Sequence, residues 1–242
     1  KDSVKIVITD AEGKEFRTMK TTAKKGINRM FWDMKKESAQ YPGGQDMFGS
    51  LFSQAVEALP GEYTVRISVG EHSSTQKVKV LADPNMEISM DEFKKNLEAK
   101  ARFQKAIATT TEVYKKMDEA TKSINKVMTF IADHKGAEVD TVKEEGKKLQ
   151  KKLEEIKYQA VAKQVKGIAG DTNDLEARLQ ALGLYFFSAM TPPAETEMQI
   201  LGDIEKQLET YQKAVDAFIE KDLKAFKETL KKAGLETVSI PD

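Results

Sequence analysis

The chain has 242 residues, of which 39 are basic and 39 acidic, so its formal net charge is zero. This balance argues against a dedicated nucleic-acid-binding protein, which would carry a basic excess on one face. The absence of cysteine excludes a disulfide framework, a zinc–thiolate site and a cysteine nucleophile. No apolar run approaches the ~18–20 residues that a membrane-spanning helix requires.

Two short strands are expected at the beginning of the chain, over residues 4–8 and 15–20. The first is rich in β-branched residues, which favour strands. Between the two strands, Asp10 can close an Asx turn on the main chain, and Gly13 can adopt a positive φ angle. The sequence therefore predicts a β-hairpin here.

The stretch that follows contains the only tryptophan of the chain, Trp32. Gly26 is expected to turn the main chain and to open a third strand, Ile27–Asp33, which Asp33 caps at its end. A large aromatic side chain within a strand is typical of a hydrophobic core. Trp32 is therefore predicted to fill the core of the β-rich half.

Residues 35–60 form an insertion that is longer than an ordinary connection. Turn residues at positions 41–44 are followed by large apolar side chains without clear periodicity. Two interpretations stay open, because the insertion can fold over its own domain or present an apolar contact to a neighbouring domain or chain. The candidate interface residues are Met47, Phe48, Leu51 and Phe52.

The clearest strand follows Pro60-Gly61, since apolar and polar side chains alternate over residues 63–69. This alternation predicts one buried face and one solvated face. A return strand is expected over residues 76–81, and Asp83-Pro84 ends the β-rich half. We expect an Ig-like antiparallel β-sandwich over residues 1–83, although five strands are few for a fold that has about seven.

Helical patterns fill residues 84–242. Ser89 and Glu92 form a capping box at the start of a long helix. An apolar stripe in steps of three and four extends this helix to Gly136, the expected C′ residue. A second helix carries Gly146 on its apolar stripe, where glycine costs about 1 kcal/mol of helix propensity. The close approach of a neighbouring helix would explain this glycine.

Three more helices are expected in the remainder of the chain. Asp171 or Thr172 can cap the first of them, and Thr191-Pro192-Pro193 separates it from the next, because proline suits the first helical turn. Asp222 can cap a short last helix that ends at Gly234. Short connections give antiparallel neighbours, so the helices predict an antiparallel α-helical bundle and the whole chain an α+β multidomain protein.

Residues that could carry chemistry are few. His72 in a turn and His134 at a helix end are expected to be solvated surface residues. Asp10, Asp33 and Asp83 at strand ends could bind calcium, but turn and cap roles explain them more simply. The sequence has no His-x-x-x-His pair and no glycine-rich phosphate loop. We therefore expect no catalytic, cofactor-binding or metal-binding residue in this chain.

Three segments carry a resemblance to a known family. Residues 7–14, 26–33 and 60–67 resemble the Ig-like domain of the flagellar hook-capping type. The same order occurs in the C-terminal region of large bacterial proteins with a sortilin-like, BNR-repeat β-propeller, which are often described as glycosyl hydrolases. The helical half is similar to their C-terminal tail over residues 83–85, 175–179, 191–194 and 222–226.

The resemblance implies a function without catalysis for this chain. It resembles the family outside the propeller, so no catalytic residue carries over, and any hydrolase activity belongs to the larger protein. Related Ig-like domains have strand sequence before the position of Val4, so the chain is expected to be a fragment. The implied role is an accessory module that packs against a β-propeller of the same protein or another protein. The implied location is periplasmic, cell-surface or secreted.

An alternative stays open, in which the chain binds carbohydrate as an accessory module of a glycoside hydrolase-like protein. Exposed aromatic rings would then stack on sugar rings. The rings available in the insertion are those of Tyr41, Phe48 and Phe52.

Overall fold

The computed structural model describes residues 3–43, 55–85, 87–163 and 173–235. The chain divides into two compact units. The first consists of Lys1–Ala39, Phe48–Gln104 and Phe186–Pro193, and the second of Gln40–Met47, Lys105–Tyr185 and Ala194–Asp242. That residues 1–83 and 84–242 form two domains that fold independently stays a prediction.

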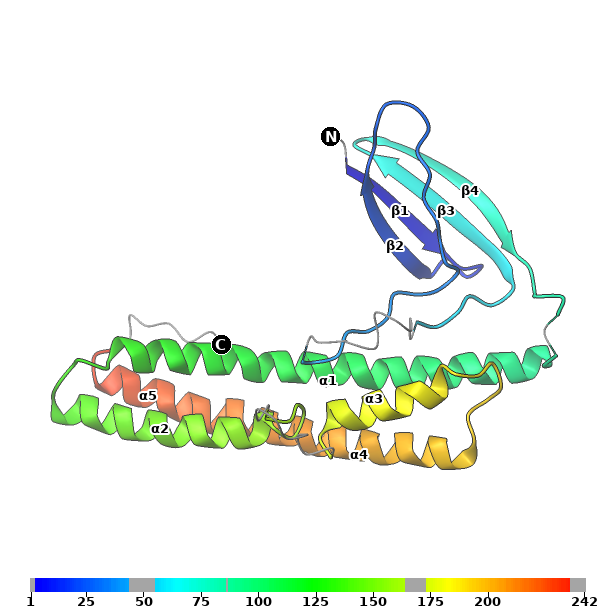
Figure 1. The fold of residues 1–242 in the computed structure, drawn as a ribbon. Coiled ribbons are helices and arrows are strands. Elements are labelled where there is room, and N and C mark those ends of the chain that lie inside the picture. Colours follow the sequence, from blue (N-terminus) through cyan, green and yellow to red (C-terminus); the bar gives the residue numbers. More distant parts are fainter. Residues whose placement is uncertain (1–2, 44–54, 86, 164–172, 236–242) are drawn as a thin grey trace. The chain divides into compact units, whose positions relative to one another are not determined.

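The first unit contains a four-stranded antiparallel sheet with the strand order β2-β1-β3-β4 (Figure 1). Two hairpins form it, and their first strands lie side by side at its centre. Together with the helices, this sheet confirms the mixed α+β class. The strands are β1 (Ser3–Thr9), β2 (Glu15–Thr22), β3 (Gly61–Val69) and β4 (His72–Val80).

The turn between β1 and β2 forms as predicted. Asp10 Oδ1 accepts hydrogen bonds from the main-chain N–H groups of Glu12 at 3.1 Å and Lys14 at 2.9 Å. Gly13 has a φ angle of 81°, which a side chain would disfavour. The local sequence thus determines this hairpin.

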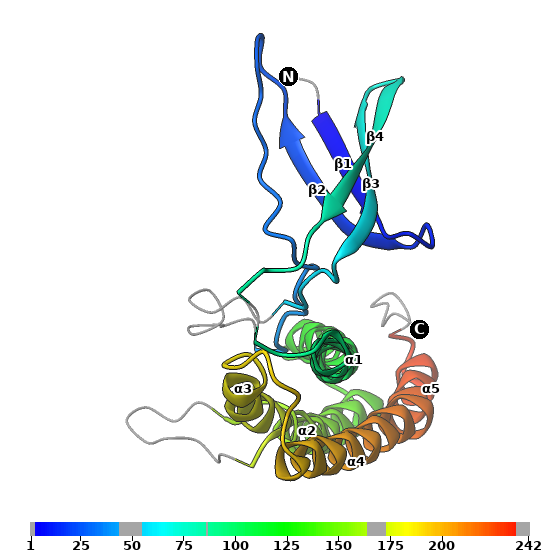
Figure 2. The ribbon, with the colours of Figure 1, turned by 90° about the vertical axis from the view of Figure 1, so that its right-hand side faces the viewer.

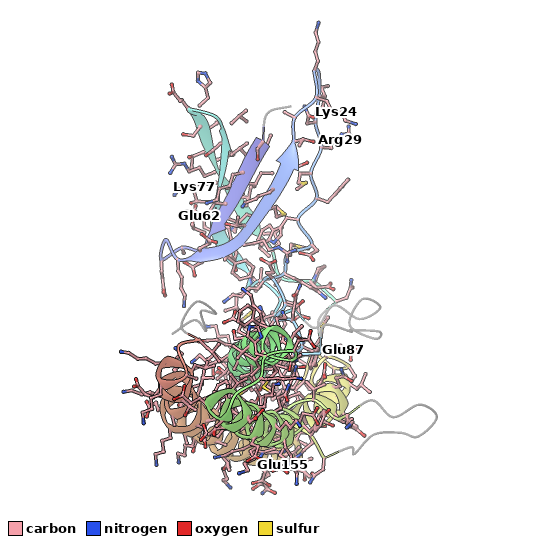
Figure 3. All side chains as sticks on the ribbon, turned by 90° about the vertical axis from the view of Figure 1, so that its left-hand side faces the viewer. Lys24, Arg29, Glu62, Lys77, Glu87 and Glu155 are labelled. Atoms are coloured by element: carbon pink, nitrogen blue, oxygen red, sulfur yellow. The ribbon has the colours of Figure 1, made fainter. Side chains whose placement is uncertain are left out.

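The strand register places apolar side chains on one face of the sheet. Ile6 lies opposite Met19 of β2 and Ile67 of β3, so that these three residues share a face. The opposite face is polar, and there Lys77 Nζ donates to Glu62 Oε1 at 2.6 Å (Figure 3). The core of this unit therefore lies on one side of the sheet.

The predicted third strand, Ile27–Asp33, is wrong, since this segment pairs with none of the strands in the described residues. The segment instead lies against the apolar face of the sheet, where Trp32 packs on the core, and does not join the outer edge of β2. Gly26 does turn the main chain, with a φ angle of 100°. Trp32 packs against the core of the sheet, as predicted.

In the described residues, six helical segments follow the sheet along the chain. Figures 1 and 2 show them. The part of the chain that the structure describes has no helix long and apolar enough to cross a membrane. The segments are α1 (Met90–Phe130), α2 (Ala137–Lys157), α3 (Leu175–Phe186), α4 (Glu195–Ala217), the π-helix η1 (Phe218–Leu223) and α5 (Lys224–Lys232).

The beginning of α1 is the predicted capping box. The Glu92 N–H donates to Ser89 Oγ at 3.2 Å, and the Ser89 N–H donates to Glu92 Oε2 at 3.0 Å. The end of the helix differs from the prediction. It lies at Phe130, and Gly136, with a φ angle of 142°, precedes α2 instead of ending α1.

Helices α4, η1 and α5 form one uninterrupted helical segment, so the prediction that Asp222 caps a separate helix is wrong. Asp222 lies inside η1, and its Oδ2 accepts from Lys152 Nζ of α2 at 2.6 Å. Gly234 ends α5 as predicted, in a Schellman motif: its N–H donates to Lys231, and the next N–H donates to Leu230.

The start of α3 is capped by a residue that the sequence did not indicate. Asp171 and Thr172 lie outside the described residues. Asp174 Oδ1 instead accepts from the Ala177 N–H at 3.0 Å. Gly146 of α2 is explained by close packing, as predicted, because a Cβ atom there would overlap with Met128 Sδ of α1.

Candidate functional site

The apolar face of the sheet forms one side of a groove, with a cavity of about 970 Å³. We call this side the floor. The other side is the segment of residues 28–34, which we call the wall and which runs back from the end of β2 (Figures 1 and 2). The central floor residues are Val4, Ile6, Ile8, Val65, Ile67 and Val69.

One end of the groove is filled by three aromatic rings. Trp32 of the wall contacts Phe16 and Tyr63 edge to face, with ring centroids 5.8 Å and 5.4 Å away. Trp32 Nε1 donates to the carbonyl of Lys35 at 3.2 Å, and the Tyr63 hydroxyl donates to Leu59 at 2.9 Å. Burial raises the pKa of Tyr63 above its usual value. This end of the groove is a closed core.

Beyond these rings the floor is only partly open to solvent, because Val4, Ile6 and Ile8 of β1 are buried. Ile67 is 43% exposed although β3 lies between two other strands. On and beside the wall, Phe31 is 88% exposed and Ile27 is 95% exposed. Apolar side chains of this size gain about 1.5–3 kcal/mol each when they are fully buried. Large exposed apolar side chains beside a cavity are typical of an interaction surface.

The wall is held at both ends. At one end, the Asn28 side chain accepts from the Lys24 N–H at 3.0 Å and donates to the carbonyls of Lys24 and Gly26. At the other end, the Met34 carbonyl accepts from the Ala58 N–H at 2.7 Å. The ends of the wall are therefore fixed by local contacts.

Between these ends, the main chain of the wall has no partner. Over residues 28–33, no main-chain N–H or carbonyl group forms a hydrogen bond with another described residue. At the end of this stretch, the Lys35 N–H donates to the side chain of Asp33 and not to its main chain. Six consecutive residues thus present free donors and acceptors beside an apolar floor.

The charged residues that line the groove are basic. They are Arg29 and Lys79, and no described carboxylate lines the groove, but Lys79 pairs with Glu62, so its side chain lies on the polar face of the sheet. Residues 16–32 contain five basic residues and no acidic one, and Asp33 of the wall follows them. In Figure 3, Lys24 and Arg29 are labelled close together on the loop after β2. The groove therefore favours an occupant with negative charges.

A second cavity, of about 660 Å³, lies in the second unit and contains charged side chains. Three of them have structural partners. Asp174 caps α3, Glu176 Oε1 accepts from the Gly43 N–H at 3.2 Å, and Lys157 Nζ donates to Asp118 Oδ1 at 2.7 Å. These contacts stabilise the fold.

Another buried charge lies in the first unit. The side chain of Lys100 is 2% exposed, and its Nζ contacts Glu57 Oε2 at 3.2 Å and lies 5.2 Å from the centre of the Phe187 ring. The ion pair and the ring compensate for the loss of water around the ammonium group. The described residues contain no group of three or more His, Cys, Asp or Glu side chains that could hold a metal ion.

The candidate interface residues Met47, Phe48, Leu51 and Phe52 lie outside the described residues, and the interface role stays a prediction. Of the rings named for carbohydrate stacking, Tyr41 is 4% exposed and offers no free face. Phe48 and Phe52 lie outside the described residues.

The turn aspartates lie where the sequence predicted, but His72 is the first residue of β4 and not part of the turn before it. His72 and His134 are exposed. The turn roles of the three aspartates are confirmed, because Asp10, Asp33 and Asp83 each accept a hydrogen bond from a main-chain N–H two residues later. These carboxylates therefore act as local caps.

The groove itself was not predicted from the sequence. Two signals pointed to it: the strict alternation in residues 63–69, and the small number of strands available to cover the resulting apolar face. Comparison of the chain with protein-family models, curated proteins and solved structures finds no match. The interpretation therefore depends on the residues themselves.

Proposed function

We propose that this chain is a non-catalytic interaction module, and that a partner protein docks in the groove. In this proposal the sheet is one layer of an Ig-like β-sandwich, and the helices form an antiparallel bundle that serves as a spacer. The observation that carries the proposal is the exposed part of the floor, where Ile67 is 43% exposed in a central strand. Such a face gains free energy when another apolar surface covers it.

The family resemblance suggests the identity of the partner. The chain would be the C-terminal part of a larger exported protein, and the groove would pack against its β-propeller or against another protein. The lack of a metal cluster in the described residues and the structural partners of Asp174, Glu176 and Lys157 fit a role without catalysis.

Site-specific photo-crosslinking tests this proposal. A photoreactive phenylalanine analogue replaces Ile67 on the floor in the full-length product of the gene, expressed in its own cells. The matched control places the same analogue at Thr75, which lies on the opposite face because it pairs with Arg66. We expect the floor position to form crosslinks to a β-propeller, within the same polypeptide or in another one.

The crosslinked peptides are identified by mass spectrometry. A floor position that forms no more crosslinks than Thr75 would overturn the proposed docking role. Crosslinks from Ile67 only to solvent-exposed sites of unrelated abundant proteins would also count against it.

A further inference from the structure

We propose that the occupant of the groove is an extended β-strand that pairs with the main chain of the wall. This strand places alternate apolar side chains on the floor. It carries acidic side chains toward the basic residues Lys24 and Arg29, which we call the rim. The inference rests on the proposed function and specifies its partner. It follows from three properties of the groove.

The first property is the free main chain of residues 28–33. Any occupant that fills the groove removes water from the groups of the wall that face it. A buried donor or acceptor without a partner costs about 1–3 kcal/mol. A helix or an acyl chain cannot satisfy these groups, because a helix uses its own main-chain groups internally and an acyl chain has none. A strand satisfies them by β-augmentation.

The second property is the shape of the floor. The part of the floor that solvent reaches comes from alternate positions of β3, Val65, Ile67 and Val69. Two sheet layers pack about 10 Å apart through side chains that alternate in this way. A strand beside the wall would lie in such a second layer, and every second side chain would contact the floor.

The third property is charge. Arg29 of the wall lines the groove, no carboxylate of the described residues does so, and Lys24 lies close to Arg29. Side chains of the incoming strand that point away from the floor lie near this rim. Carboxylates at these positions match the rim, whereas lysines would be repelled.

A synthetic peptide tests the inference directly. The probe is a nine-residue peptide with blocked ends, in which valine and glutamate alternate. Its binding is followed by the fluorescence of Trp32, the only tryptophan of the chain and a residue of the wall. We expect saturable binding with a shift of the emission to shorter wavelength, and slower hydrogen exchange of the amides in residues 28–33.

Two N-methylated peptides provide the decisive control. In a strand, alternate residues direct their N–H groups to opposite edges, so methylation of all valines blocks one edge and methylation of all glutamates blocks the other. We expect one methylated peptide to bind like the parent and the other to bind at least about tenfold more weakly, because several main-chain hydrogen bonds are lost.

Variants of the chain separate floor from rim. Ile67→Glu on the floor should abolish binding, and Thr75→Glu on the opposite face should leave it unchanged. Arg29→Glu should weaken binding about two- to fivefold, as for an exposed ion pair. A valine–lysine peptide should bind more weakly than the valine–glutamate peptide, and equal or tighter binding would overturn the charge assignment.

The outcomes distinguish this inference from the proposed function. Equal binding of both methylated peptides overturns strand pairing, but floor docking stands if Ile67→Glu still abolishes binding. A helical circular dichroism spectrum of the bound peptide also overturns strand pairing. If no peptide binds while the crosslinks from position 67 form, the strand is wrong and the docking role remains. If the crosslinks are absent as well, both fail.

Discussion

Two aspartates in the second unit have opposite surroundings. Asp118 accepts from Lys122 Nζ at 2.8 Å and from Lys157 Nζ at 2.7 Å, and these hydrogen bonds hold the pKa of its carboxyl below the usual value. Asp174 is buried at the start of α3, and this burial raises the pKa of its carboxyl. The two side chains should therefore respond to pH in opposite directions.

We expect Asp118→Asn to lower the free energy of unfolding by about 1 kcal/mol at pH 7, since the ion pairs are partly exposed. A lowered pKa in the folded state gives stability that is present above the unfolded pKa, ~3.9. This stability is lost as the pH falls through the folded pKa. Urea unfolding of both proteins from pH 7 to pH 3 should show the difference shrinking toward acid pH.

Asp174→Asn is the matched control, for which we expect a change in stability of the opposite sign. Asparagine can still cap α3, and the substitution removes a buried negative charge. The variant should therefore be at least as stable as the parent at pH 7. Its advantage should disappear as the pH falls through the raised folded pKa, because the native aspartate then becomes neutral. A loss of stability with the same pH slope as Asp118→Asn would contradict this interpretation.

At the level of helices, close packing favours glycine at position 146, whereas helix propensity favours alanine. Glycine inside a helix costs about 1 kcal/mol relative to alanine. The position is nevertheless occupied by glycine in α2, because the Met128 side chain of α1 takes the space of a Cβ atom. Phe226 of α5 lies against the same position. Three helices thus meet at one glycine.

We expect Gly146→Ala to destabilise the chain, because overpacking of a core costs about 1–3 kcal/mol and exceeds the gain in helix propensity. In a Met128→Ala background the same substitution should stabilise the chain, since the space is then empty. A double-mutant cycle in urea measures the coupling between the two positions. Equal effects of Gly146→Ala in both backgrounds would show that packing against Met128 is not the cause.

The elements that the sequence predicted well are those fixed by local chemistry. The Asp10 turn, the Ser89–Glu92 capping box and the Gly234 helix end each depend on residues a few positions apart. The strand Ile27–Asp33 failed because this segment packs against the apolar face of the sheet through Trp32, which depends on residues distant in sequence. The groove was missed for the same reason, since its floor and wall come from distant segments.

At the scale of the whole molecule, the two units differ in how they are stabilised. The sheet has a small core on one face, closed by Phe16, Trp32 and Tyr63. The helices bury apolar stripes such as Leu201, Ile204 and Leu208 of α4. Trp32 reports on the first unit alone, while far-ultraviolet circular dichroism reports mainly on the helices. These two signals can follow the predicted domains separately.

We expect Phe16→Ala to destabilise the sheet by about 2 kcal/mol, below the ~3–5 kcal/mol of a fully buried phenylalanine, because this ring is only partly buried. The Trp32 fluorescence transition should move to lower urea concentration, and the helical transition should stay unchanged. A parallel shift of both transitions would contradict the independence of residues 1–83 and 84–242.

The π-helix η1 accommodates one extra residue in the last helical segment. Buried residues of α4 recur in steps of three and four up to Phe218, and the next buried residue, Leu223, follows after a step of five. The wider turn absorbs the surplus residue, so Phe226 and Leu230 of α5 still point inward. One extra residue in this segment therefore leaves the helix unbroken. Deleting one residue at η1 should restore the regular spacing of three and four between buried residues.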